Sequence, residues 1–507
     1  MHSAAFTIDP AAAIGPVPRR LFGSFVEHMG RCVYTGLFEP SHPTADADGF
    51  RGDVLALVRE LGVSVVRYPG GNFISGYRWA DGVGPRETRP TRLNLAWHTL
   101  ETNAFGTDEF VRWARKAGVE PMLALNLGTG TIRDALDLLE YSNVPGGTTL
   151  SEARAANGLR APHDVRMWCL GNEMDGPWQL GHMTASEYAR LATETARAMR
   201  QVQPDLELVA CGSSGPGMPT FGDWERTVLD EAWDLVDFIS LHAYYEELDG
   251  DRASFLASAI DLERGIRQVI AVVDDVAARR QSAKRVQLSV DEWNVWYLRR
   301  QQAQPLPADW PATARISEDS YTVSDAVVVG DLLITLLEHA DRVACACLAQ
   351  LVNTIAPIHA EPGGSAWRQT TFYPFSLTAA RAVGEILRPI HGRIPTVSTV
   401  RYGDVPMVHA VAVSDRETGG LSLFVVNRDP NEAVRLSVDL RAFPGARMTS
   451  ALQLADSDPY AANTTDDPVR VVPQVLPAMP VGADGSVELV LPAASWSVFG
   501  FAAHRPA

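Results

Sequence analysis

The sequence has few cysteines, no excess of positive charge and no long apolar segment. Its five cysteines are scattered and odd in number, which does not suggest a disulfide framework. Acidic residues outnumber basic ones by 61 to 44, so the chain carries a formal charge of −17 and would repel the phosphates of nucleic acid. No window approaches the roughly 18 uncharged apolar residues of a membrane-spanning helix, so we expect no membrane partner.

The first residues lack the layout of a secretory signal, because the basic pair Arg19 and Arg20 follows the apolar part instead of preceding it. We therefore expect a cytoplasmic protein. Cys345 and Cys347 have no C-x-x-C partner or nearby histidine pair, so no metal site is predicted. The rival fold is an open doubly wound sheet, but its first βα turn would be expected to carry G-x-G-x-x-G, which is missing here. We expect no cofactor.

The chain is long, with 507 residues of ordinary globular composition, which suggests more than one domain. Short apolar runs recur through its first three quarters with helical patterns between most of them, as in a (β/α)8 TIM barrel. We predict this barrel over residues 18–385. The eight runs are 23–28, 63–71, 120–128, 166–173, 207–214, 237–245, 286–294 and 343–353.

Capping patterns mark several of the helices between these strands. Residues 53–62 and 107–118 each end in a glycine, and Thr107 is the predicted N-cap of the second. Thr184 and Glu187 form a capping-box pattern at the start of 184–201. Helices are also expected over 252–279 and 320–340.

The pattern changes after about residue 385. Short runs alternate or are apolar, with Gly, Pro, Asn and Asp between them and no helical return, which is typical of an antiparallel β-sandwich. We therefore predict a jelly-roll-like sandwich domain over 386–507, joined by a strand from residues 1–17. Its strands are expected at 4–10, 407–414, 421–429, 434–440, 486–492 and 495–502.

Two glutamates stand at predicted strand ends, where the reactive groups of such barrels lie. Glu173 ends the fourth run and Glu292 the seventh. Either one alone fits a structural ion pair with an arginine. Together they would face each other across the barrel mouth. Most glycoside hydrolases use such a pair of carboxyl groups as their catalytic residues.

The surrounding residues fit a sugar site but allow other interpretations. Several tryptophans fall on predicted loops or strand ends, where they could stack on a sugar or anchor the core. The turn Gly70-Gly71-Asn72 could cradle a phosphate, although a tight turn that brings Asn72 to the barrel mouth fits better because the P-loop lysine is missing. His242 lacks a second ligand at metal spacing, so hydrogen bonding is its predicted role. The tryptophans are Trp79, Trp97, Trp178, Trp293 and Trp296.

Long motifs in the barrel region resemble the α-L-arabinofuranosidases of glycoside hydrolase family 51. They span almost the whole predicted barrel, whereas the C-terminal region matches only in general character. The motifs are FGSFVEHMGRCVYTGLFEP (22–40), VVRYPGGNFISGYRWADGVGP (65–85), LNLAWHTLETNAFGTDEF (93–110), WCLGNEMDGPWQLGHMTASEYA (168–189), FISLHAYY (238–245), LSVDEWNVWY (288–297), LAQLVNTIAPI (348–358) and AWRQTTFYPF (366–375).

The resemblance implies a retaining, exo-acting enzyme that releases terminal arabinofuranose from arabinose-containing oligosaccharides. In it Glu173 matches the general acid/base, Glu292 the nucleophile, and Asn172 the residue that contacts the sugar 2-hydroxyl. His242 would support the two carboxylates. The resemblance further implies sugar-binding or orienting roles for Glu27, Arg67, Asn72, Trp97, Tyr244, Trp296 and Gln350.

Two segments depart from the family pattern. Residues 141–165 and 303–316 are expected to form loops beyond the sugar pocket, where they would affect the leaving-group preference. The resemblance also suggests a homo-oligomer, often a hexamer. Two alternatives stay open: a related hydrolase of xylosides or internal glucan bonds, and a carbohydrate-binding protein without activity.

Overall fold

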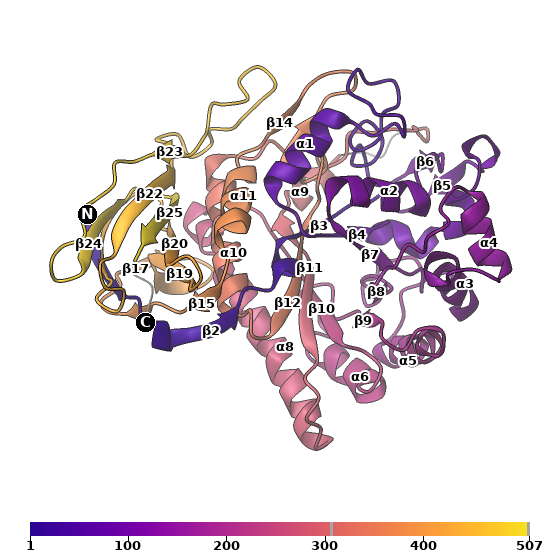
Figure 1. Ribbon diagram of the computed structural model, residues 1–507, viewed down its shortest axis with the longest axis horizontal. Helices are drawn as coiled ribbons and strands as arrows, with labels where there is room; N and C mark the ends of the chain where they lie inside the picture. The colour runs from indigo at the N-terminus through magenta and orange to yellow at the C-terminus, as the bar shows by residue number, and fades with distance from the viewer. Residues whose placement is uncertain (305–307, 504–507) are drawn as a thin grey trace.

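The computed structural model describes residues 1–304 and 308–503. Figure 1 shows two bodies side by side, a barrel ringed by helices on the right and a layered β-structure on the left. The barrel is formed by the N-terminal and middle parts of the chain, and the layered β-structure mainly by the orange and yellow C-terminal part. The predicted fold class, a TIM barrel with an antiparallel β-sandwich, is confirmed.

The barrel consists of eight parallel strands that close in chain order, with β12 pairing back onto β3. Each predicted run coincides with one of these strands, and only β11 extends one residue beyond its run. The strands are almost wholly buried, because side chains fill the barrel and helices cover it, so they read as continuous apolar runs. They are β3 (Gly23–Phe25), β4 (Val65–Tyr68), β7 (Glu120–Ala124), β8 (Met167–Leu170), β9 (Glu207–Ala210), β10 (Phe238–Tyr245), β11 (Gln287–Val295) and β12 (Val343–Ala349).

Helices return the chain between the strands. They are α1 (Gly52–Leu61), α2 (Thr107–Ala117), α3 (Ile132–Asn143), α4 (Thr149–Ala156), α5 (Ala185–Val202), α6 (Asp223–Ala232), α7 (Arg252–Leu256), α8 (Ala259–Arg279), α9 (Leu298–Gln302), α10 (Val323–Glu338) and α11 (Phe372–Arg381).

The capping residues explain where several helices begin and end. The capping box of Thr184 and Glu187 is confirmed at α5, and left-handed Gly62 and Gly118 end α1 and α2. Thr107 as N-cap is wrong. Gly106 takes that position, because its N–H donates to the Glu109 carboxylate at 3.0 Å and draws Thr107 into the helix.

Two other segments differ from expectation. The predicted helix over 252–279 is interrupted between α7 and α8. Residues 141–165 are not only loop, since they include the end of α3 and all of α4. Buried Arg154 of α4 donates to the carbonyls of Val144 and Leu159, so a charged side chain holds this segment together. Of the other departing segment, 303–316, residues 305–307 lie outside the described residues.

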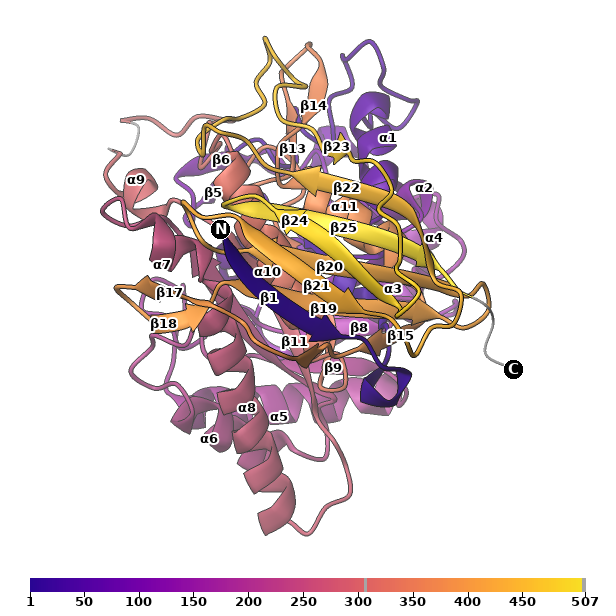
Figure 2. The same cartoon turned by 90° about the vertical axis from the view of Figure 1, so that its left-hand side faces the viewer.

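The sandwich has two main sheets. The order of one is β16-β1-β21-β24 and of the other β2-β15-β19-β20-β25-β22-β23. N-terminal β1 runs parallel to β21, and Figure 2 shows it in indigo among the C-terminal strands. The strands are β1 (His2–Thr7), β2 (Ala13–Pro16), β15 (Glu385–Leu387), β16 (Ile390–His391), β19 (Val408–Asp415), β20 (Gly420–Asn427), β21 (Val434–Asp439), β22 (Arg447–Leu454), β23 (Gln474–Val475), β24 (Ser486–Leu491) and β25 (Ser495–Ala502).

Three small hairpins complete the strands. They are β5 (Arg92–Asn94) with β6 (Thr99–Glu101), β13 (Ile358–Ala360) with β14 (Ala366–Arg368), and β17 (Thr396–Thr399) with β18 (Gly403–Pro406). None of the helices in the described ranges is both long enough and apolar enough to cross a membrane.

Helix α10 joins the two bodies. It is buried along nearly its whole length, since one side packs on the barrel and the other on β19, β20 and β25. Buried Asp331 of α10 accepts two hydrogen bonds from Arg428, at 2.7 and 3.0 Å, and pairs with His409 at 2.7 Å. The two bodies are therefore held together by a buried charged cluster as well as by apolar contacts.

Candidate active site

A narrow pocket opens at the carboxyl ends of the barrel strands, where loops from several strands meet. Its lining combines three carboxylates, amides and aromatic rings around a small space of about 30 Å³. The lining residues are Phe25, Glu27, Met29, Gly71, Asn72, Trp97, Glu173, Tyr244, Glu292, Trp296, Gln350 and Ile355.

Glu173 lies in a sharp turn just after β8. The backbone of Gly171 and Glu173 has positive φ angles of 96° and 45°, a conformation that a glutamate adopts only when its surroundings hold it there. Its Oε1 pairs with His242 Nδ1 at 2.8 Å, and its Oε2 accepts from Trp178 Nε1 at 2.8 Å. Burial, together with the charge of Glu292, raises the pKa of Glu173 above its ordinary value.

Glu292 lies within β11 and accepts hydrogen bonds on both oxygens. Arg67 Nη1 donates to Oε1 at 2.6 Å and the Tyr244 hydroxyl to Oε2 at 2.8 Å. The same Arg67 donates through Nη2 to Asn172 Oδ1 at 2.7 Å. One guanidinium thus fixes both the carboxylate of Glu292 and the amide orientation of Asn172.

A bulge between β10 and β11 brings the side chains of His242, Asp291 and Glu292 close together. Ser240 pairs with Ser289 and His242 with Glu292, so β11 has one residue more than β10 in this interval. Such a bulge re-aims side chains. As a result neighbouring Asp291 and Glu292 both approach His242, at 3.2 and 3.6 Å.

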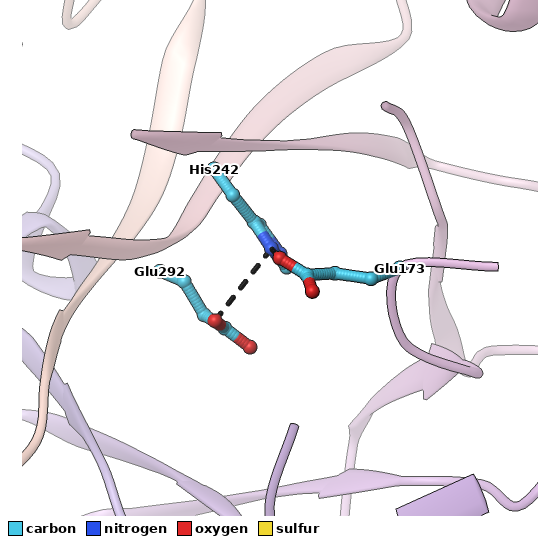
Figure 3. Close-up of side chains that lie close together, drawn as sticks. All are labelled: Glu173, His242 and Glu292. Carbon is cyan, nitrogen blue, oxygen red and sulfur yellow. Dashed lines mark hydrogen bonds and ion pairs between the residues drawn. The ribbon is translucent and has the colours of Figure 1, made fainter. Parts of the chain in front are cut away.

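His242 lies between the two glutamates, as Figure 3 shows. Burial alone would lower its pKa, but the charge of Glu292 and the hydrogen bonds to Asp291 and Glu173 raise it well above the ordinary value. The pKa of Asp291 is lowered. Burial alone would raise it, but the charge of Arg67 and the hydrogen bond from His242 outweigh that effect. These partners favour the protonated form of His242.

The same three groups raise the question of a metal ion. Ligand atoms of Glu173, His242 and Glu292 all lie within 4.8 Å of one another. A protonated imidazole has no free lone pair for a metal, and the pKa of His242 keeps it protonated. The cluster accordingly fits a hydrogen-bonded acid–base set better than a metal site.

Glu27 lies on another wall of the pocket among hydrogen-bond donors. Its Oε1 accepts from the Phe73 N–H at 2.9 Å and from Trp97 Nε1 at 3.0 Å, and its Oε2 accepts from Gln350 Nε2 at 3.3 Å. Burial, with Glu292 nearby, raises its pKa to about 7 despite these donors. Its protonation state will thus change near neutral pH.

The glycine pair after β4 gives the two carboxylates their space. A Cβ on Gly70 would meet Glu27 Cγ at 2.6 Å, and one on Gly71 would meet Glu292 Oε1 at 2.9 Å. The N–H of Phe73, directly after this turn, donates to a carboxylate, Glu27, whose negative charge disfavours a phosphate here. Asn72 begins a 3-10 turn and lines the pocket.

All eleven residues predicted for the site meet in this one place. Eight line the pocket. Of the other three, Arg67 donates to Glu292 and to Asn172, and His242 pairs with Glu173. Trp296 packs edge-on against Tyr244 with ring centroids 5.0 Å apart. Two of the tryptophans considered for stacking on a sugar do not line the pocket. Trp79 packs on Tyr141, and Trp293 is fully buried.

Sequence reasoning misses how two residues contact the site. Asp291 stands next to Glu292 in the motif, but only the bulge turns both inward. Trp178 is one of five candidate tryptophans, and its sequence position gives no reason to prefer it as the partner of Glu173. Its only signal is its place five residues after Glu173, in the same turn.

Sequence profiles of two families match the chain. The "Alpha-L-arabinofuranosidase 1 domain" profile covers residues 57–256 and the "Alpha-L-arabinofuranosidase C-terminal domain" profile covers 291–495. Each contains one of the two glutamates, and the boundary of the second falls inside β11.

Similar proteins match nearly the whole chain. An "Intracellular exo-alpha-(1->5)-L-arabinofuranosidase" of Streptomyces lividans is 56% identical over 98% of this chain and 75% of its own. An "Exo-alpha-(1->6)-L-arabinofuranosidase" of Bifidobacterium longum is 51% identical over 98% and 97%. A solved structure of a family 51 alpha-L-arabinofuranosidase from Bifidobacterium longum has 49% identity and a TM-score of 0.95 over 99% and 100%. The chain therefore belongs to the α-L-arabinofuranosidases of glycoside hydrolase family 51.

Proposed function

We propose that the chain is a retaining, exo-acting α-L-arabinofuranosidase that releases terminal non-reducing arabinofuranose from arabinose-containing oligosaccharides. The observation that carries this is the spacing of the two glutamates. One oxygen of Glu173 lies within 4.8 Å of one of Glu292. Retaining enzymes place their carboxyl groups about 5–5.5 Å apart, whereas inverting enzymes need about 6.5–9.5 Å to admit a water molecule.

In the first step Glu292 attacks the anomeric carbon and Glu173 protonates the departing glycosidic oxygen. Arg67 and Tyr244 hold the Glu292 carboxylate at fixed angles, so it approaches without rearranging. The raised pKa of Glu173 suits an acid that must still hold its proton near neutral pH.

In the second step water displaces the sugar from Glu292 with a second inversion, so the configuration is retained overall. Once Glu292 is esterified its negative charge is gone, and one cause of the raised pKa of Glu173 goes with it. Glu173 then exists as a carboxylate and removes the proton from the attacking water. His242 keeps its hydrogen bond to Glu173 through both steps, so it acts as a positioning residue for the acid/base.

The remaining pocket residues bind and orient the sugar. Asn172 is buried, and its Nδ2 has no hydrogen-bond partner within the part of the chain that the structure describes, so it is free to donate to the sugar 2-hydroxyl. Glu27, Asn72 and Gln350 supply further hydrogen-bonding groups, and Trp97 and Trp296 form apolar walls. So narrow a pocket leaves no room for an interior segment of a sugar chain, which supports exo action.

The decisive experiment compares two variants on aryl α-L-arabinofuranosides of different leaving-group acidity. Glu292→Ala should lose activity on every substrate. Glu173→Ala should lose far less on the most acidic leaving group, because protonation matters least there. Equal losses across the series would contradict the acid/base assignment. Aryl xylosides and glucosides serve as controls for the alternative hydrolases, and sugar binding without turnover would indicate the binding-protein alternative.

We further propose that the protein is cytoplasmic and forms a homo-oligomer, a hexamer by family resemblance. Its partners are oligosaccharides, and it binds neither nucleic acid nor a membrane. The word "intracellular" in the name of the Streptomyces relative supports the location. A division into a barrel of residues 18–385 and a sandwich of 386–507 with residues 1–17 is part of this proposal. Light scattering after size-exclusion chromatography measures the mass in solution, and a monomer would contradict the assembly.

A further inference from the structure

A second cavity, here called the outer cavity, lies beside the catalytic pocket. Its volume is about 520 Å³, within the range of about 300–1,000 Å³ typical of small-molecule sites. The walls come from the segment 297–301, the loop 315–320, the β13–β14 hairpin and the sandwich loop 463–465. Nothing in the proposed reaction uses it.

The two cavities share a wall. Trp296 lines the catalytic pocket, and its Nε1 donates to the Ser317 hydroxyl at 3.0 Å. That hydroxyl donates to Gln301 Oε1 at 2.7 Å. Both Ser317 and Gln301 line the outer cavity, so one side chain and one hydrogen bond separate it from the sugar pocket.

The hairpin wall carries two polar groups without partners. His359 and Trp367 are paired across β13 and β14, with ring centroids 5.2 Å apart, and are 6% and 9% exposed. Neither His359 Nε2 nor Trp367 Nε1 has a hydrogen-bond partner among residues 1–304 and 308–503. Burial lowers the pKa of His359 to about 4, so at neutral pH this wall offers an uncharged imidazole beside an indole N–H donor.

The charged side chains of the outer cavity largely satisfy one another. Arg315 pairs with Glu318 at 2.8 Å and with Glu361 at 2.5 Å, and Arg300 approaches Asp319 at 3.4 Å. A charged ligand would have to break these pairs. What remains for a ligand are aromatic rings and the neutral hydrogen-bonding groups of Ser, Thr, Asn and Gln residues, a combination that suits a neutral ring with several hydroxyl groups.

We propose that the outer cavity binds a second neutral pentose unit, outside the catalytic pocket. The inference rests on the proposed function, because that function supplies pentoses next to this wall. The unit can belong to a distant part of the oligosaccharide whose end is being cleaved, or it can be a free arabinose molecule. The hydroxyl chemistry is the same in both cases, and the test below separates them.

The test uses Trp367→Phe with Trp496→Phe as its matched control. Each change removes a buried indole N–H that has no partner in the described residues, but Trp496 lies at the contact of α10 with the sandwich. Neither change breaks a hydrogen bond within the described chain, and the melting temperature of each variant checks that it is folded. kcat/KM is measured on an aryl α-L-arabinofuranoside and on linear arabino-oligosaccharides of increasing length, and calorimetry measures binding of L-arabinose.

For a distant unit of the substrate, Trp367→Phe should lower kcat/KM on the longer oligosaccharides about three- to tenfold, the effect of one hydrogen bond, and leave the aryl substrate unchanged. For a free sugar, wild type should bind two equivalents of L-arabinose, and Trp367→Phe should bind the second equivalent about three- to tenfold more weakly. Equal behaviour of wild type, Trp367→Phe and Trp496→Phe in both assays would overturn the proposal and leave the outer cavity to ordered water. Lack of wild-type activity on the aryl arabinofuranoside would instead refute the proposed function, and calorimetry would still decide whether the cavity binds sugar.

Discussion

Replacing Trp178 is a direct way to change the pKa of Glu173, the proposed acid. Its Nε1 donates to Glu173 Oε2 at 2.8 Å, a hydrogen bond that favours the ionised form and lowers the pKa of Glu173. Trp178→Phe keeps a ring and removes the donor. The pKa of Glu173 should therefore rise, and the alkaline limb of the kcat/KM profile should move to higher pH, because that limb reports loss of the acid's proton.

The size of the shift follows from the environment of the bond. A hydrogen bond to a charged group contributes about 1.5–3 kcal/mol when buried. Trp178 is 54% exposed, and water competes for the carboxylate, so we take about 1 kcal/mol, which corresponds to about 0.7 pKa unit. The profile is recorded on an aryl arabinofuranoside, and its limbs describe the coupled pair of glutamates.

Trp79→Phe is the matched control, since its Nε1 donates to the Asp134 carbonyl, away from the glutamates. It should leave both limbs in place. An alkaline limb that stays put in Trp178→Phe, or moves to lower pH, would refute the reasoning.

Two further predictions concern space in the pocket and stability. Gly71→Ala would place a methyl group 2.9 Å from Glu292 Oε1 and should reduce kcat about a hundredfold with little change in melting temperature, whereas Gly217→Ala, with open space around it, should leave kcat unchanged; equal activities would show that the carboxylate can yield. Burial tends to lower the pKa of His409, but Glu338 and Asp331 raise it to about 9. Protonated His409 therefore contributes up to about 3 kcal/mol to the free energy of unfolding below about pH 6.5, and this contribution is lost as the pH rises through 9. Denaturant unfolding between pH 6 and 10 should show this loss in wild type and a flatter dependence in His409→Gln; parallel curves would contradict it.

The barrel is predictable because burial on both faces leaves a simple signal. Each strand is a short apolar run, and each polar residue at its end has to be explained by chemistry or by a partner. Glu173 and Glu292 stand out from the sequence in this way, and the family resemblance adds the residues around them.

What could not be predicted depends on strand register and side-chain contacts that are fixed only in the folded chain. The bulge that turns Asp291 and Glu292 to the same side exists only in the register of β10 against β11. The choice of Gly106 over Thr107 as N-cap depends on where the Glu109 side chain reaches. Segment 141–165 has no strong helical period, and α4 is held instead by the hydrogen bonds of buried Arg154.

The central claim, that Glu292 is the nucleophile and Glu173 the acid/base, is tested most directly by trapping the covalent intermediate. Glu173→Ala is mixed with an aryl arabinofuranoside that has a very acidic leaving group, so that the first step proceeds and the second, which needs a base, is slow. Mass spectrometry of the digested protein should show one arabinosyl unit on the peptide that contains Glu292. An adduct on another residue, or turnover without an adduct to a product of inverted configuration, would contradict the account.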